Sequence, residues 1–520
     1  MRVLELYLPR FKNLRDFSIH FDADSSVAVL VGRNGTGKSN ILEALTLIFR
    51  DMDLGNPATI DYRISYLCRG RVVSVEGYRG ARGVDATIDG VGVSSGDVVG
   101  KTGRKYRPDF VFGYYSGPSN RLEEHFWDHQ VRFYRALVRG QENPLRPLFY
   151  ARAVHSNFVL LAFFVEEDPA VRAFLSDQLA VEQFDSALFE MQKPLWRSKQ
   201  GDPRFWFARG TVEVLLDRLY GVALAPMRFD ASVKIGMRRP TRKEHLFLFL
   251  PNLGALRSLR DLYSTNQDFF KALESTYISE LIHDVRVRVG LRMSRSSLTF
   301  RELSEGEQQL LLVLGLMRFT REDESLFLLD EPDTHLNPTW SVQYREFLET
   351  IGGLGETSQV LMATHDPLVV SSMTRQEVRI LERDDNSMIK ALIPLEDPRG
   401  MGVTNLLTSD VYGLPAAFDL KLYRDLIRKR ELAAKESLSD AERNELKVLS
   451  ERLSDLGMLI EDTDPDFQEY LRARYHTSTG ETMETRSQDE VEADRRLAEE
   501  LMDRIVGERS SEPAQRTEEE

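Results

Sequence analysis

The sequence predicts an α/β fold, and three observations favour this class. Within the first fifty residues, the apolar pattern is typical of three short strands, VLELYL, DFSIHF and VAVLV, followed by a helix from Lys38 to about Arg50. The third strand leads into GRNGTGKS, residues 32–39, a glycine-rich turn that opens the helix. Much further along the chain, the apolar run LFLLDE at 326–331 ends in two carboxylates, as a buried strand does beside a ligand in an open α/β sheet.

Composition allows a large globular core and excludes several classes of protein. The chain has 520 residues, of which 42% are hydrophobic and 29% charged. Its single cysteine, Cys68, excludes internal disulfides, zinc hooks and iron–sulfur clusters. The longest apolar runs have eight residues, whereas roughly 20 are needed to cross a bilayer. Because the N-terminus also lacks a signal-peptide pattern, we expect a cytoplasmic protein without a membrane segment.

The remaining elements follow from local patterns. Residues 61–112 are rich in glycine and β-branched side chains and predict short antiparallel strands, whereas 120–230 look mostly helical, with Leu215, Leu216 and Leu219 on one stripe. Strands return at 245–250 and 284–291.

The C-terminal part of the chain has a different character. Residues 419–436 and 440–456 predict a hairpin of two charged amphipathic helices, and Ser439 and Glu442 have capping-box spacing at the start of the second. A helix near 488–506 and a disordered tail should follow. The last forty residues hold 14 acids and 6 bases, so they contribute most of the net charge of −14, and global charge neither supports nor excludes nucleic acid.

The GRNGTGKS segment fits the phosphate-binding pattern G-x-x-x-x-G-K-[ST] in its expected position between a strand and a helix. Its glycines let backbone N–H groups turn toward phosphates, while Lys38 and the helix N-terminus supply positive charge. The hydroxyl of Ser39 would bind Mg²⁺. The alternative, a glycine-rich turn without a ligand, is disfavoured by the combination of pattern and context.

The two carboxylates after the 326–329 strand predict a metal and water site. Asp330 would hold Mg²⁺ through its water shell, and Glu331 would polarise the attacking water as a general base. Alone, the segment is equally typical of a core strand followed by solvated acids. Lys38 and Asp330 lie 292 positions apart, which predicts a bulky insertion between the two halves of the site.

Two short segments near these carboxylates complete the pattern. LSEGEQ, residues 303–308, begins an apolar helix; Ser304 and Glu307 would cap it, and the capped N-terminus with Gly306 beside it could also face an anion. ATHDP, residues 363–367, follows a strand-like run and places His365 where it could contact a γ-phosphate or its water, although a lone histidine there is more often structural.

Taken in order, GRNGTGKS, LSEGEQ, LFLLDEPDTHLNP and ATHDP resemble the Walker A, signature, Walker B with D-loop, and switch-histidine motifs of ABC-type ATPases, and YLPRFKNLRDF is similar to the N-terminal strand of their SMC/RecF/OLD branch. The resemblance implies an ABC-ATPase head, with a mixed central sheet and an added antiparallel β layer, that binds and hydrolyses ATP with Mg²⁺. It implies an ATP-bridged dimer in which Ser304 and Gly306 of one subunit reach the nucleotide held by Lys38 of the other. The implied site residues are, for catalysis, Glu331, His365 and Lys38; for nucleotide binding, Gly32, Asn34, Gly35, Thr36, Gly37, Lys38, Ser39, Asn40, Ser304, Gly306, Glu307, Lys12 and Asn13; and for the metal, Ser39 and Asp330.

On this resemblance we divide the chain into five regions. They are an N-terminal ATPase lobe with its β layer, a mainly helical insertion, a C-terminal ATPase lobe, a helical hairpin region and an acidic, partly disordered tail, at 1–118, 119–230, 231–409, 410–480 and 481–520.

The chain departs from this family pattern at several points. No glutamine suits the Q-loop position within 110–160, and His155 is a weak substitute. Long heptads, a CxxC hook and an acidic Toprim-like cluster are absent from the sequence, which argues against a chromosome-tethering arm and against a built-in nuclease. What remains resembles the shorter ATPases of bacterial defence operons, of the Septu or retron-associated kind, and implies a separate partner nuclease, often of HNH type.

Two basic stretches raise the question of DNA. The first contains Arg238, Arg239, Arg242 and Lys243, and the second sets Arg286 and Arg288 on one face of a strand. Such faces could bind a phosphate backbone, but they are equally typical of a solvated sheet face whose arginines pair with acids. Three functions therefore stay open: an ATPase that controls DNA binding or a partner effector, including a repair ATPase; an assembly with ATP as a structural ligand; and, disfavoured by the long insertion, a transporter subunit.

Overall fold

The computed structural model describes residues 1–141, 146–196, 199–233, 241–292, 297–320, 324–355, 357–384, 386–435, 437–456 and 496. They divide into two compact units, Met1–Ile393 and Pro394–Glu520. The boundary between the units lies sixteen residues before the predicted one at 409. No helix among the described residues combines the length and the apolar character needed to cross a membrane.

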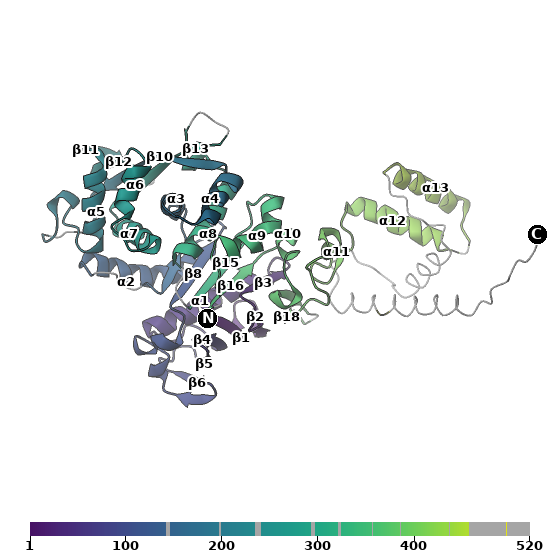
Figure 1. The fold of residues 1–520 in the computed structure, drawn as a ribbon. Helices are drawn as coiled ribbons and strands as arrows, with labels where there is room; N and C mark the ends of the chain where they lie inside the picture. The colour runs from purple at the N-terminus through teal and green to yellow at the C-terminus, as the bar shows by residue number, and fades with distance from the viewer. Residues whose placement is uncertain are drawn as a thin grey trace, which may run out of the picture. The chain divides into compact units, whose positions relative to one another are not determined.

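A mixed sheet forms the centre of the first unit (Figure 1). Its strand order is β18-β17-β3-β16-β15-β8-β9, in which β18 alone is antiparallel to its neighbour. The three middle strands are completely or almost completely buried and rich in Val, Leu and Met, as expected for parallel strands covered on both faces. The strands are β3 (Val27–Gly32), β8 (Phe110–Tyr115), β9 (Leu148–Tyr150), β15 (Ser325–Asp330), β16 (Ser358–Ala363), β17 (Val378–Arg383) and β18 (Ile389–Leu392).

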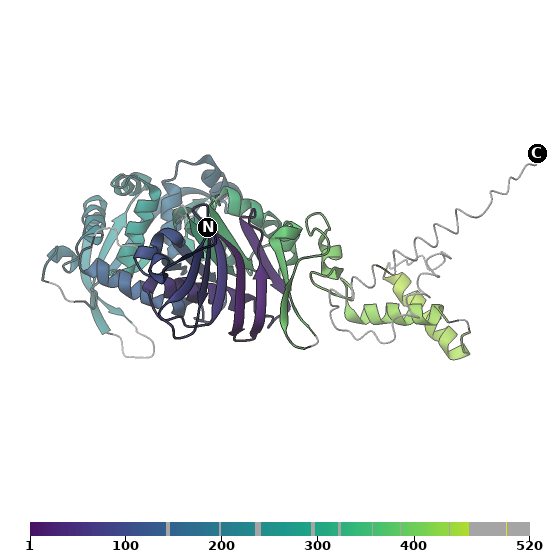
Figure 2. The ribbon, with the colours of Figure 1, turned by 90° about the horizontal axis from the view of Figure 1, so that it is seen from below.

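An antiparallel sheet of order β2-β1-β4-β5-β6-β7 is the added β layer that the sequence predicts. It lies beside the central sheet in both views (Figures 1 and 2). Its apolar face shares one hydrophobic cluster with α1 (Lys38–Leu54) and with the central strands. Its strands are β1 (Arg2–Phe11), β2 (Leu14–His20), β4 (Tyr62–Cys68), β5 (Arg71–Gly77), β6 (Val84–Ile88) and β7 (Val91–Val93). The predicted fold class is confirmed by these two sheets.

The segment between β8 and β15 is an α/β insertion. Over 119–230 helices outweigh strands, in line with the prediction, but β10 and β11 are strands that the sequence did not indicate. Its antiparallel sheet has the order β11-β12-β10-β13-β14 and takes strands from both sides of residue 230. The sequence hid β10 because bulges at three places shift its register against β13 and break the alternation of apolar side chains. The strands are β10 (Val181–Gln192), β11 (Leu224–Val233), β12 (Thr241–Leu250), β13 (Ile282–Leu291) and β14 (Ser297–Thr299).

Helices pack between this sheet and the central sheet. The all-apolar α3 lies against α8 and α7 and is almost fully buried, whereas α5 buries the predicted stripe Leu215, Leu216 and Leu219. The helices of the first unit besides α1 are α2 (Trp127–Val138), α3 (His155–Phe164), α4 (Pro169–Ala173), α5 (Thr211–Val222), α6 (Leu253–Arg260), α7 (Asn266–Ile278), α8 (Glu305–Thr320), α9 (Pro338–Thr350) and α10 (Pro367–Val370).

The second unit contains the predicted helical hairpin. After α11 (Val403–Thr408), helices α12 (Leu420–Ala433) and α13 (Asp440–Asp455) pack together, and the Ser439 hydroxyl accepts from the Glu442 N–H while the Glu442 carboxylate accepts from the Ser439 N–H. Arg428 and Glu445 join the two helices by an ion pair of 2.9 Å. The predicted helix near 488–506 and the tail lie outside the described residues, apart from Arg496.

Candidate nucleotide-binding site

The carboxyl ends of three adjacent parallel strands bring the predicted site residues together. The order β3-β16-β15 sets the loop after Gly32, the turn at Asp330 and Glu331, and the segment that contains His365 at one edge of the sheet. Open α/β sheets bind ligands at this edge. Residues that are 292 positions apart in the sequence thus become neighbours.

The loop between β3 and α1 presents an uncapped helix N-terminus. Gly37, the N-cap residue, has a φ of 92°, no side chain caps the helix, and its first turn contains no acid. The first N–H groups of a helix lack partners within the helix, so they are available to an anion. At Gly32, with a φ of 142°, a Cβ atom would stand 2.4 Å from the Leu381 carbonyl oxygen, so only glycine fits there.

Lys38 lies folded over this loop. Its Nζ donates to the Gly32 carbonyl oxygen over 2.7 Å, and the residue is 7% exposed. Burial lowers the pKa of Lys38, and the nearby carboxylates of Glu331 and Asp330 partly oppose that change. A buried ammonium with two carboxylates close by is suited to a polyanionic ligand that carries its own metal ion.

Ser39 and Asp330 form the contact that joins the two halves of the site. Ser39 Oγ donates to Asp330 Oδ1 over 2.9 Å, and Asp330 is 2% exposed. Burial raises the pKa of Asp330, while the Ser39 hydrogen bond and the Arg121 guanidinium lower it. These hard oxygen ligands fit Mg²⁺, which takes few protein ligands and completes its shell with water and phosphate oxygens. The described residues contain no cluster of three or more His, Cys, Asp or Glu able to hold a metal ion.

Glu331 adopts a strained backbone that directs its carboxylate away from the core. Its φ is 53°, an uncommon value for a residue other than glycine. The turn is fixed because its N–H donates to the Ala363 carbonyl over 2.8 Å and its carbonyl accepts from the Thr334 hydroxyl over 2.9 Å. The side chain is about one-third exposed, and its Oε1 lies 3.5 Å from Nδ1 of His365. Glu331 and His365 thus face a solvent-accessible space together.

The LSEGEQ segment lies at the surface at the start of α8. The Ser304 hydroxyl and N–H both donate to the Glu307 carboxylate over 2.7 Å, so the predicted capping box is present. Ser304 and Glu305 are exposed, whereas Gly306 is buried against the backbone of His335, in the loop that follows Glu331. The segment therefore faces outward, as contact with a second molecule requires.

The residues predicted from the N-terminal strand separate into two groups. The Asn13 amide donates to the Gly35 carbonyl over 2.7 Å and accepts from the Asn40 amide over 2.6 Å, so it braces the phosphate loop. Lys12 instead pairs with Glu43 on α1. Asn34 and Gly35 lie exposed at the loop tip, and the Thr36 hydroxyl donates to the Arg33 carbonyl.

The sequence analysis did not single out Arg121. This residue lies in the segment that follows β8, and its side chain contacts Asp330. Its Nη2 donates to Asp330 Oδ2 over 2.9 Å, and its guanidinium lies over the Tyr115 ring. No sequence motif marks Arg121. It could have been found only from the position of β8 next to β15 in the sheet. His155 is not a substitute for a Q-loop residue, because it is buried among Phe149, Phe158 and Tyr277.

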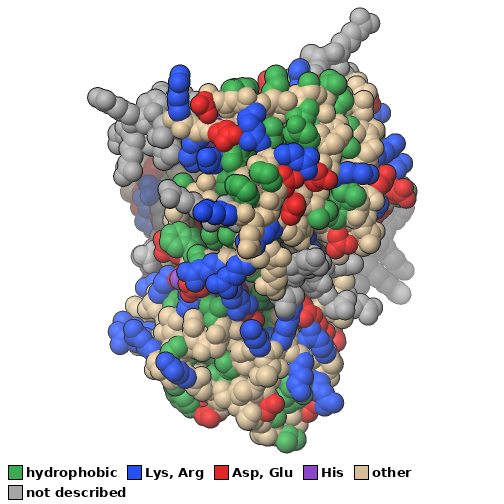
Figure 3. All heavy atoms as spheres, turned by 90° about the vertical axis from the view of Figure 1, so that its left-hand side faces the viewer, with side chains coloured by type: hydrophobic (Ala, Val, Ile, Leu, Met, Phe, Trp, Pro, Cys, Tyr) green, Lys and Arg blue, Asp and Glu red, His purple; other side chains and the backbone are tan. Residues whose placement is uncertain are grey.

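The basic residues do not form an open phosphate-binding surface on β13. Arg286 pairs with Asp284 over 3.0 Å and with Glu190 over 3.3 Å, and Arg288 lies 3.9 Å from Asp185. Arg242 is exposed and Lys243 half-buried, whereas Arg238 and Arg239 lie outside the described residues. On the face that carries β11, α5 and α2, basic side chains are dispersed among apolar ones (Figure 3).

The fold and this site are those expected of an ABC-type ATP-binding head. Two family models match the chain: "AAA ATPase domain" at residues 1–69, and "AAA domain, putative AbiEii toxin, Type IV TA system" at 258–371. The first match spans β1 to β4 with α1, and the second runs from the end of α6 to α10, so it takes in part of the insertion.

The chain is similar to two curated proteins. It is 28% identical over 228 residues to the Septu protein PtuA of Bacillus mycoides (strain KBAB4), covering 41% of this chain and 31% of that protein. It is 24% identical over 123 residues to the retron Vc95 probable ATPase of Vibrio cholerae serotype O1 biovar El Tor, covering 22% and 23%. The matches thus span about a third and a quarter of the lengths of these relatives.

Solved structures of similar fold include two SMC heads. The SMC head domain from Thermotoga maritima has a TM-score of 0.31 and 14% identity, covering 76% of this chain and 99% of that one. An SMC head bound to the C-terminal winged-helix domain of ScpA has a TM-score of 0.33 and 12% identity, covering 75% and 98%.

Proposed function

We propose that this protein hydrolyses ATP at a site shared between two copies of the chain and uses this cycle to control a separate nuclease in antiphage defence. The observation that carries the proposal is the Ser39–Asp330 contact beside an uncapped helix N-terminus, since it places metal-binding oxygens next to a phosphate cradle. Relatedness to a Septu protein and a retron ATPase supports the defence role.

The residues of the site have distinct tasks in this proposal. The N-terminus of α1 and Lys38 bind the phosphates, and Ser39 and Asp330 hold the magnesium ion. That ion neutralises charge on the phosphate oxygens when it is bound. Glu331 accepts a hydrogen bond from the attacking water and orients it, and His365, 3.5 Å from Glu331, holds the same water or the terminal phosphate.

In this proposal, the second copy of the dimer supplies further hydrogen-bond donors to the phosphates. Ser304 is exposed at the N-terminus of α8, whose dipole favours negative charge. In a head-to-head pair, this end of one copy would approach the phosphates held by Lys38 of the other. Because Gly306 packs on the loop that follows Glu331, docking at the signature segment would also act on the general base of its own copy.

The substitution Glu331→Gln tests the proposal. It keeps shape and hydrogen bonding but removes the base, so we expect ATP binding to persist, hydrolysis to fall at least about a hundredfold, and ATP-dependent dimers to accumulate in size-exclusion chromatography with light scattering. Glu346→Gln, which neutralises an exposed carboxylate on α9, is the matched control and should behave as the wild type. If the Glu331→Gln protein has the same oligomeric size and the same rate of ATP hydrolysis as the wild type, the alternative of ATP as a structural ligand is favoured.

The partner nuclease is tested separately. The reading frames beside this gene should include a nuclease, for which the HNH type is expected, and the two proteins should co-purify. A neighbouring permease would favour the transport alternative.

Direct binding of DNA is tested with the remaining basic residues. Because Arg286 and Arg288 form ion pairs, Arg242 and Lys243 are the described candidates for phosphate contacts. If neutralising Arg242 and Lys243 leaves the salt dependence of DNA binding unchanged, this surface does not bind phosphates.

A further inference from the structure

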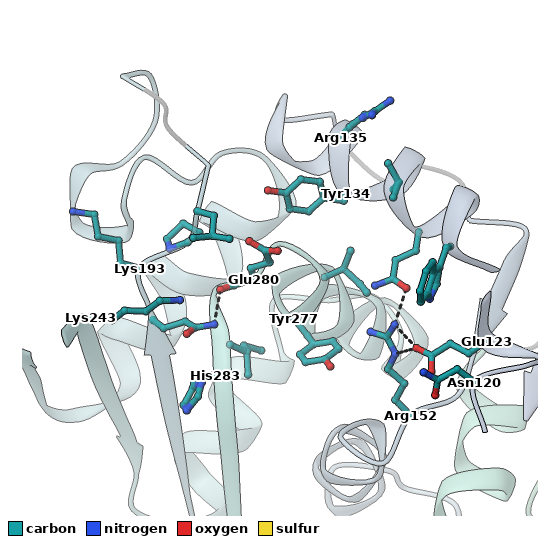
Figure 4. Close-up of a pocket in the computed structure, with 18 residues that line it drawn as sticks. Asn120, Glu123, Tyr134, Arg135, Arg152, Lys193, Lys243, Tyr277, Glu280 and His283 are labelled. Atoms are coloured by element: carbon teal, nitrogen blue, oxygen red, sulfur yellow. Dashed lines mark hydrogen bonds and ion pairs between the residues drawn. The ribbon is translucent and has the colours of Figure 1, made fainter. Parts of the chain in front are cut away.

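A large open pocket lies in the insertion and shares no lining residue with the phosphate loop. Its volume is about 860 Å³, and it is bounded by α2, the C-terminal end of α7 and the ends of β10, β12 and β13 (Figure 4). This volume is in the range of pockets that bind small molecules. Neither the ATP site nor the proposed dimer contact uses it.

One wall of the pocket is basic. Lys193 and Lys243 lie on the same side of it, from the end of β10 and from β12 (Figure 4). Neither has an acidic partner within 4.0 Å among the residues that the structure describes. On the opposite wall, Glu123 is neutralised by Arg152 at 2.6 Å. The lysines therefore offer positive charge to an anionic group, such as a phosphate.

The remaining surfaces suit an aromatic ring with polar edges. Trp127 is 50% exposed and stands one heptad before Tyr134 on α2, and Tyr277 faces the same space from α7. Exposed aromatic rings stack on nucleobases without need for a particular sequence. The Glu280 carboxylate projects between these groups and can accept N–H donors from a base edge.

We propose that this pocket binds a nucleotide whose base carries an amino group, with its phosphate at Lys193 and Lys243 and its base among Trp127, Tyr134 and Tyr277. A simple polyanion is disfavoured because Glu280 would repel it. The same chemistry is present in a free mononucleotide and at the 5′-phosphorylated end of a DNA strand. The proposal does not depend on ATP hydrolysis, since the pocket and the phosphate loop are separate.

Binding is measured in the full chain carrying Lys38→Ala, which disables the ATP site. We expect AMP to bind with a stoichiometry of one by calorimetry and to quench tryptophan fluorescence. Adenosine and ribose 5-phosphate, which each lack half of the ligand, should bind at least about tenfold more weakly, because each lost charge-assisted hydrogen bond or stacked ring is worth about 1–3 kcal/mol. A 5′-phosphorylated tetra-deoxyadenylate that binds more tightly than AMP identifies a strand end as the ligand; the reverse order identifies the free nucleotide.

Three variants in this background locate the site. Lys193→Ala with Lys243→Ala should weaken AMP at least about tenfold, and Trp127→Phe should remove most of the fluorescence quench. Arg172→Ala with Arg257→Ala is the matched control, because both side chains are exposed, neither lines the pocket, and the pair removes the same two charges. The proposal is overturned if AMP does not bind to the Lys38→Ala protein, if the lysine variant and this arginine control bind equally, or if tripolyphosphate competes as well as AMP.

Discussion

Substitution of Gly306 in α8 tests how the signature segment, LSEGEQ at 303–308, packs against the loop that follows Glu331. A Cβ atom at Gly306 would lie 2.3 Å from the His335 carbonyl oxygen and 3.2 Å from its carbon, and both are backbone atoms that cannot rotate away. Gly221, near the end of α5, is its matched control, because a Cβ there would meet no atom within 4 Å. The substitutions Gly306→Ala and Gly221→Ala add the same methyl group to a helix.

The two variants should change stability in opposite directions. Alanine in a helix is favoured over glycine by roughly 0.5–1 kcal/mol, and this gain applies to both sites. Overpacking costs about 1–3 kcal/mol, and only Gly306 incurs it. We therefore expect Gly221→Ala to stabilise the ATPase unit by up to about 1 kcal/mol, and Gly306→Ala to destabilise it by up to about 2 kcal/mol.

Urea unfolding followed by fluorescence measures the stability, and phosphate release measures turnover. In Gly306→Ala the loop that follows Glu331 must move, so ATP hydrolysis should fall while binding of ATP by the phosphate loop persists. Gly221→Ala should hydrolyse ATP as the wild type does. If Gly306→Ala is as stable and as active as Gly221→Ala, the signature segment does not pack on the Glu331 loop as described, and the proposed route from the dimer contact to the general base fails.

Three further substitutions test other parts of the molecule. Burial raises the pKa of Asp333 to about 6; the folded protein thus binds its proton more tightly than the unfolded chain does, and stability falls by up to about 3 kcal/mol as pH rises from 4 to 7. Asp333→Asn should remove this loss, whereas equal pH profiles of urea unfolding for variant and wild type would contradict it. Phe158→Ala, at a fully buried position of α3, should cost about 3–5 kcal/mol; a loss below about 1 kcal/mol in the same assay would mean that this core is loosely packed. Ser439→Ala removes the cap of α13 and should lower the helical stability of the hairpin by about 1 kcal/mol; unchanged amide hydrogen exchange at the start of α13 would refute it.

The sequence was most informative where function requires particular residues at fixed spacing. In three places a local motif stands next to a clear periodicity of apolar side chains, and the structure has each element as predicted. These are the phosphate loop, the strand that ends in Asp330, and the hairpin cap at Ser439. The strand β10 was missed because its bulges remove the period-two signal and because its partners lie far along the chain, with Gln192 paired to His245 and Val181 to Leu291. Arg121 could not be found from its neighbours in sequence, since its role depends on strand order alone.

The charges of the candidate nucleotide site are arranged as expected where a charged ligand completes them. Burial raises the pKa of Asp330 and lowers that of Lys38, so in each case the protein interior disfavours the charged form. Arg121 offsets part of this cost from one side, and the strained turn at Glu331 adds to it. A stable core would gain from apolar side chains here, but a site for a metal–triphosphate needs these charges. Since a magnesium ion and phosphates would pair with both groups, nucleotide binding should stabilise the first unit more than the phosphate contacts alone account for.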